Sequence, residues 1–180
     1  LQQAMEIPGN DAWEAFILGG VLGVDSIHAM RKGKYLTSLT RAVDAMRSIG
    51  RSQELAPEFV DPLLGDGLYH YWRTVISKSR KGLPSFADKR KLGIEQMQKV
   101  EKEAIFLGPA ATFALTYTFM EEGTLRRSMS AALRNQKRYP DNIVNNILVG
   151  RLYMYRRQYA KAELSFLKVL KVSPKNEKVH

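Results

Sequence analysis

Apolar residues recur at helical spacing along most of this chain, most clearly from Ile143 to residue 170. The apolar and aromatic positions in this stretch are 143, 144, 147 to 149, 152 to 155, 159, 162, 164, 166, 167, 169 and 170. This pattern predicts two amphipathic helices separated by a break at residues 156–158. Pro140 precedes the first helix and Pro174 follows the second, which suits a residue that cannot continue a helix.

The preceding stretch has the same organisation. A helix is expected from Pro109 to about Glu122, a turn at residues 123–124, and a second helix from Leu125 to about Arg138. Residues 109–139 and 143–173 are therefore each predicted to be a helix, a tight turn and a helix. Pro140 and Pro174 stand at matching places, 34 residues apart in the sequence.

The first half of the chain also predicts helices. These are expected at residues 11–31, 35–54, 61–78 and 88–106, with a basic loop containing Gly and Pro at residues 79–87. No stretch of useful length alternates between apolar and polar residues as a strand does. The sequence therefore predicts an all-α protein.

Helical pairs with a 34-residue period are the mark of tetratricopeptide repeats. The last predicted pair has the signature residues of that family at the expected mutual spacings: Gly150, Tyr153, Ala162, Phe166 and Pro174. The equivalent places one period earlier are filled by Leu115, Phe119, Gly123, Ser128, Ala132 and Pro140. The chain thus resembles the tetratricopeptide repeat family, and the stretch at residues 67–72 looks like its divergent bacterial members. Asn146 and Thr116 depart from the family pattern, which has Trp and Gly at these places.

The resemblance implies a right-handed solenoid of antiparallel helical hairpins. About four units are expected, at residues 11–57, 60–106, 109–140 and 143–174, which together form a single domain over residues 1–180. In the second unit, Gly67 is expected to be the packing glycine, Gly93 the small residue that it meets, and Met97 the large one.

The resemblance also implies a binding face, because the first helices of such hairpins line the concave side of the array. Residues at the family's groove positions are then expected to contact a partner: Leu68, Tyr71, Phe113, Tyr117, Met120, Arg151, Met154 and Tyr155, with Ala110, Val144 and Ile147 beside them. Most of these are apolar or aromatic, so the implied function is a scaffold that binds an apolar peptide or helix of another protein. The alternative is that a neighbouring helix, or more of the chain, covers them.

The chain carries a formal net charge of +10, which favours acidic partners. Its densest basic segment spans residues 73–91, in which Asp88 is the only acid. The candidate anion-binding residues there are Arg73, Lys78, Arg80, Lys81, Lys89 and Arg90. A module for an anionic polymer or lipid surface is therefore the alternative function, although Phe86 is the only aromatic residue placed to stack on a base, so nucleic acid is not the expected partner. A solvated loop explains the same charges.

Candidate catalytic chemistry is sparse. The chain has no Cys, and its three His share no ligand spacing, so no metal site is predicted. Asp66 and His70 are one turn apart and could hydrogen-bond, but no nucleophile accompanies them. We therefore expect no enzyme, no cofactor and no small-molecule substrate. The apolar stretches at residues 15–24 and 104–120 are too short or too interrupted for a membrane span, and no signal peptide is visible, so a soluble protein is expected with its compartment left open.

Overall fold

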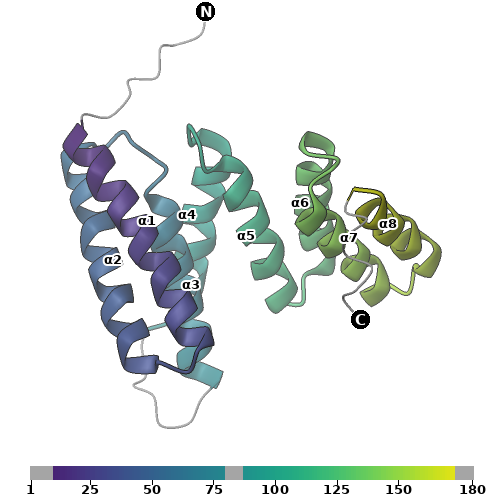
Figure 1. The fold of residues 1–180 in the computed structure, drawn as a ribbon, viewed down its shortest axis with the longest axis horizontal. Coiled ribbons are helices and arrows are strands. Elements are labelled where there is room, and N and C mark those ends of the chain that lie inside the picture. The colour runs from purple at the N-terminus through teal and green to yellow at the C-terminus, as the bar shows by residue number, and fades with distance from the viewer. Residues whose placement is uncertain (1–9, 80–86, 173–180) are drawn as a thin grey trace, which may run out of the picture. The chain divides into compact units, whose positions relative to one another are not determined.

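The computed structural model describes residues 10–79 and 87–172, and all regular secondary structure in these ranges is α-helical (Figure 1). The helices are α1 (Asn10–Arg31), α2 (Tyr35–Leu55), α3 (Leu63–Ser79), α4 (Arg90–Glu103), α5 (Gly108–Glu121), α6 (Leu125–Arg138), α7 (Ile143–Tyr155) and α8 (Tyr159–Val172). Each begins and ends within a few residues of its predicted position, which confirms the all-α class. Of the described helices, none combines the length and apolar character that crossing a membrane requires.

The chain divides into two compact units, Leu1–Gly108 and Pro109–His180. The boundary falls between the second and third of the repeat units expected from the sequence. We refer to these as the first unit, which holds α1 to α4, and the second unit, which holds α5 to α8.

Two helical pairs make up the first unit, in which α1 packs against α2 and α3 packs against α4 (Figure 1). The α3–α4 crossing depends on two glycines. A Cβ atom built on Gly93 would lie 2.5 Å from the carbonyl oxygen of Gly67, and one built on Gly67 would lie 2.9 Å from that of Gly93. Because real Cβ atoms do not approach so closely, only glycine fits on either side, as the sequence predicted for this pair.

The second unit repeats its structure after 34 residues. Helix α6 begins at Leu125 and ends at Arg138, and α8 begins and ends 34 positions later in the sequence, at Tyr159 and Val172. The turn that precedes each of them has one residue in the left-handed region, with φ of 67° at Gly123 and 56° at Arg157. The amide that follows closes both turns in the same way, from Thr124 N to Phe119 O and from Gln158 N to Tyr153 O, each at 2.9 Å.

The core of the second unit lies between its hairpins. Its buried members are Met129, Ala132, Leu148, Val149 and Leu152, and the half-buried side chains packed against them are Phe113, Tyr117, Met120, Leu125 and Tyr153. Ala162 is buried, as expected from the sequence, and the ring of Phe166 is so close to Gly150 that a Cβ atom there would lie 2.5 Å from it. The position that the family pattern assigns to a packing glycine is therefore in close helix contact here.

Candidate partner-binding site

Three predicted site residues, Phe113, Tyr117 and Met120, follow one face of α5. Their side chains are half-buried and pack against the core of the second unit. The rings of Phe113 and Tyr117 are edge to face, with centroids 5.1 Å apart. Each therefore presents only part of its surface to a partner and uses the rest to hold α5 against its neighbours.

A hollow of about 450 Å³ opens next to this face, within the second unit. Residues from the start of α5, the end of α6 and the start of α7 line it: Pro109, Ala110, Phe113, Asn135, Tyr139, Asn142, Val144 and Asn145. The sequence predicted Ala110, Phe113 and Val144 at this face, and the structure brings all three to one hollow. The remaining lining residues were missed, because they belong to α6 and the α6–α7 connection rather than to the predicted groove positions.

Amide side chains fix the polar frame of this hollow. Asn142 accepts a hydrogen bond from the amide of Asn145 at 2.9 Å and so caps α7. Asn135 donates to the carbonyl of Pro109 at 2.9 Å, and Asn145 Nδ2 donates to that of Ala132 at 3.2 Å. Asn145 Oδ1 is buried, and no donor among the described residues reaches it. These bonds tie the ends of three helices together, which holds the walls of the hollow in place.

A stripe of exposed side chains runs along α7, at spacings of three and four residues. It consists of Val144, Ile147, Arg151, Met154 and Tyr155. Val144 reaches the hollow described above, whereas Met154 lines a different hollow together with residues of α8. The structure thus assigns predicted groove residues to two surfaces of the second unit, and one continuous patch containing Tyr117, Arg151 and Tyr155 stays a prediction.

Of the two predicted site residues in the first unit, one lies in its core. Tyr71 is fully buried, so its assignment to a binding surface is wrong. A Cβ atom on Gly93 would lie 2.9 Å from Tyr71 N, which shows that α4 covers α3 at this point. Leu68 is only half-buried and remains available in part.

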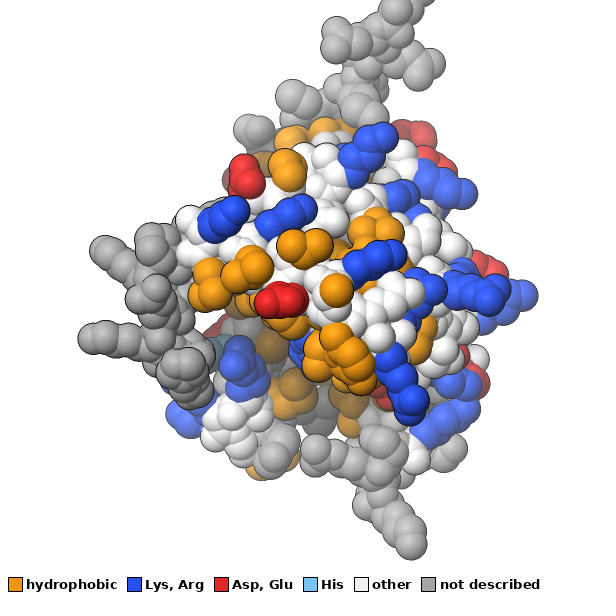
Figure 2. All heavy atoms as spheres, turned by 90° about the vertical axis from the view of Figure 1, so that its right-hand side faces the viewer, with side chains coloured by type: hydrophobic (Ala, Val, Ile, Leu, Met, Phe, Trp, Pro, Cys, Tyr) orange, Lys and Arg blue, Asp and Glu red, His pale blue; other side chains and the backbone are white. Residues whose placement is uncertain are grey.

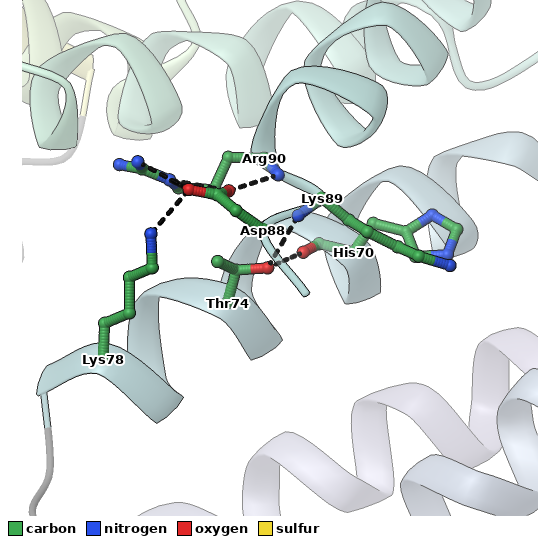
Figure 3. A network of polar contacts seen from close by, with 6 residues as sticks. All are labelled: His70, Thr74, Lys78, Asp88, Lys89 and Arg90. Carbon is green, nitrogen blue, oxygen red and sulfur yellow. Dashed lines mark hydrogen bonds and ion pairs between the residues drawn. The ribbon is translucent and has the colours of Figure 1, made fainter. Parts of the chain in front are cut away.

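The basic segment is partly neutralised by its own acid (Figure 3). Asp88 forms ion pairs with Lys78 at 2.6 Å and with Arg90 at 2.9 Å. The guanidinium of Arg73 lies over the ring of Tyr69, 4.9 Å from its centroid, and Lys89 is exposed. Arg80 and Lys81 lie outside the described residues. Because two of the candidate cations already meet a carboxylate, the described part of this segment offers an anion less charge than the sequence suggested.

These ion pairs also affect acid stability. The Arg90 guanidinium, hydrogen-bonded to Asp88, lowers the pKa of that carboxyl far below its ordinary value, and Lys78 acts in the same direction. A pKa that is lower in the folded state adds stability above the unfolded value of about 3.9, and that stability is lost as the pH falls. We therefore expect Asp88→Asn to lose less stability than the parent between pH 5 and pH 2. Urea unfolding at a series of pH values measures this.

Lys78→Met serves as the companion variant, because it removes one of the two cations and keeps the carboxylate. Its acid sensitivity should fall between those of the parent and Asp88→Asn. Equal pH dependence in the parent and Asp88→Asn would show that the ion pairs contribute nothing to folding.

The suggested pair of Asp66 and His70 is not what the structure shows. Asp66 accepts a hydrogen bond from Gln53 Nε2 at 2.6 Å, and His70 Nδ1 is 2.8 Å from Gln96 Oε1. Each side chain thus has an amide partner on a neighbouring helix. Within residues 10–79 and 87–172, no cluster of His, Asp and Glu side chains is suited to hold a metal ion.

Comparison with known proteins adds no family to this description. No protein-family model matches the chain, and no curated protein is similar enough to be reported as a relative. The functional argument therefore depends on the structure's own surfaces.

Proposed function

We propose that this chain is a tetratricopeptide-like repeat scaffold that binds a segment of another protein. The 34-residue recurrence of α6 and α8, with the same turn and the same closing hydrogen bond before each, supports the repeat architecture. Repeats of this kind are built to present extended surfaces rather than catalytic centres. The proposal keeps the solenoid and its groove as its structural basis.

The hollow at Phe113, Tyr139 and Val144 is the observation that carries the proposal. Its size falls within the range typical of ligand pockets, and its apolar wall admits a large side chain such as Leu or Phe. Tyr139 and Asn142 are exposed at its edge and supply polar contacts. Aromatic anchors with a polar rim are typical of interaction hot spots. We propose that the occupant is a peptide segment with an apolar anchor and acidic neighbours, since the chain carries a net charge of +10.

A random peptide library displayed on phage tests the proposal without knowledge of the natural partner. Selection on the full chain should enrich peptides that share an apolar anchor, and an enriched peptide then becomes the probe. We expect Val144→Glu to weaken binding of that probe at least about tenfold, which corresponds to 1.4 kcal/mol. Val144 is 54% exposed, so the change should leave the thermal midpoint nearly unchanged.

Leu36→Glu is the matched control. Leu36 is the more exposed of the two, at 84%, and lies on α2 in the first unit, so the same change there should leave probe affinity unaltered. Failure to enrich any peptide, or equal affinity in Val144→Glu and the parent, would contradict the groove assignment. Steeply salt-dependent binding to heparin or to anionic vesicles, in place of peptide binding, would favour the basic segment as the functional site.

A further inference from the structure

The last hairpin carries an open, nearly wholly apolar hollow of about 280 Å³. It is separate from the hollow at Val144, and its lining residues come from the end of α7 and one face of α8: Met154, Tyr159, Ala162, Glu163, Phe166, Leu167 and Leu170. Several of these side chains are well exposed, among them Tyr159 at 60% and Leu170 at 47%. Exposed apolar groups gathered in one place call for a partner more strongly than scattered ones do.

The preceding hairpin shows what kind of group this surface fits. Met120, Leu125, Met129 and Ala132 pack in the core cluster that holds Leu148, Val149 and Leu152 of α7. The residues 34 positions later in the sequence are Met154, Tyr159, Glu163 and Phe166, and all four line the open hollow. The surface that α7 occupies on one hairpin is therefore repeated, unoccupied among the described residues, on the next.

Two further positions extend the correspondence. Leu167 and Leu170 line the open hollow and stand 34 residues after Leu133 and Gln136. Gln136 Nε2 donates a 2.7 Å hydrogen bond to Asn146 Oδ1, so its position belongs to the contact with α7. Where α6 has a polar residue that binds a polar group of α7, α8 has a leucine. The repeated surface is therefore more apolar at this edge than the original.

We propose that this surface, the α7–α8 seat, binds an amphipathic helix of a partner protein, with aliphatic residues spaced as they are in α7. The residues that α7 places in the core, at 148, 149 and 152, define the pattern: two neighbouring aliphatic residues and a third one turn further on. The seat continues a helix–helix interface that the second unit already contains. This inference goes beyond the proposed function, because it adds a second binding surface with its own ligand chemistry.

Charge around the seat indicates what the rest of the partner helix carries. Figure 2 views the molecule from the side of α8 and shows groups of apolar side chains with Lys and Arg side chains among and around them. Exposed cations follow the seat in sequence on both sides, at Arg156, Arg157, Lys168 and Lys171. A helix with acidic residues flanking its aliphatic stripe would complement them, whereas a basic helix would be repelled.

A peptide from this chain is the most direct probe. We expect a labelled peptide of residues 141–156, with a short acidic tail for solubility, to bind the full chain saturably in a fluorescence anisotropy titration. The same peptide with Leu148→Glu and Leu152→Glu should not bind. Leu167→Glu in the protein should weaken binding at least about tenfold, because it places a charge in the seat. Leu167 is already 45% exposed, so this variant should fold as the parent does.

Leu164→Glu is the matched control on the same helix. Leu164 is 62% exposed and does not line the seat, so affinity for the peptide should stay at the parent value. Val144→Glu should also leave it unchanged, which separates this surface from the hollow at Val144. Equal binding by Leu167→Glu and the parent would overturn the proposal, because the peptide would then be displacing α7 from its own place or binding without specificity.

Two other occupants have distinct outcomes. Sedimentation equilibrium that shows self-association of the parent, lost in Leu167→Glu, would make a second copy of this chain the occupant and overturn the partner helix. Tighter peptide binding after removal of residues 173–180 would identify those residues as the occupant, with the same consequence. A monomeric chain whose affinity for the peptide is unaffected by that removal supports the partner helix.

Discussion

Gly93→Ala is expected to destabilise the first unit by about 3 kcal/mol, at the upper end of what overpacking costs. The added methyl would lie 2.5 Å from Gly67 O and 2.9 Å from Tyr71 N. Both are backbone atoms of α3, so no side-chain rotation relieves the contact and the two helices have to separate. Urea unfolding followed by tryptophan fluorescence measures the change in the first unit alone, since the only two tryptophans are Trp13 and Trp72.

Gly50→Ala provides the contrasting control. Gly50 is also a helical glycine, in α2, but a Cβ atom there would meet nothing within 4 Å. Alanine should therefore stabilise the first unit by up to about 1 kcal/mol through helix propensity alone. If Gly93→Ala unfolded at the same urea concentration as the parent, or gained stability as Gly50→Ala does, the close α3–α4 crossing would be disproved.

The helices were predictable from the sequence because their determinants are local. Apolar spacing locates each helix, and Pro140 together with Gly123 sets the connections. The break at residues 156–158 was located too, although nothing in the sequence indicates that Arg157 takes the left-handed conformation that Gly123 takes one repeat earlier. That preference comes from the repeat geometry, which makes a non-glycine residue adopt a conformation it ordinarily avoids.

The candidate sites were harder to predict because they depend on which helix covers which face. Tyr71 stands four residues after Gly67, so both lie on one face of α3. The prediction that Gly67 meets Gly93 already implied that Tyr71 is covered by α4, and the family's groove positions led to the opposite assignment. The ion pair of Lys78 and Asp88 had no such signal, because the residues between them do not fix how the chain returns.

Removing the Asp61 carboxylate is expected to cost the first unit about 3 kcal/mol, because it leaves several buried or half-buried donors without their acceptor. The sequence placed Asp61 in a helix, but α3 begins at Leu63 and the Asp61 side chain is fully buried just before it. Its carboxylate oxygens accept hydrogen bonds from three consecutive amides, those of residues 105, 106 and 107, at 2.9, 2.9 and 2.7 Å. One side chain thus ties the segment that follows α4 to the start of α3. Asp61→Ala, followed by urea unfolding with tryptophan fluorescence, measures its contribution.

Two further variants separate the carboxylate's hydrogen bonds from a general effect of losing an acid. Asp61→Asn keeps one acceptor oxygen, so it should be destabilised less than Asp61→Ala and more than the parent. Asp66→Ala removes a carboxylate of the same helical region that receives one side-chain hydrogen bond from Gln53, and its cost should stay near 1 kcal/mol. Equal losses for Asp61→Ala and Asp66→Ala would mean that water replaces the carboxylate at the three amides. The segment after α4 would then be held by its packing, through contacts such as that of Phe106 with Trp13, whose ring centroids are 5.2 Å apart.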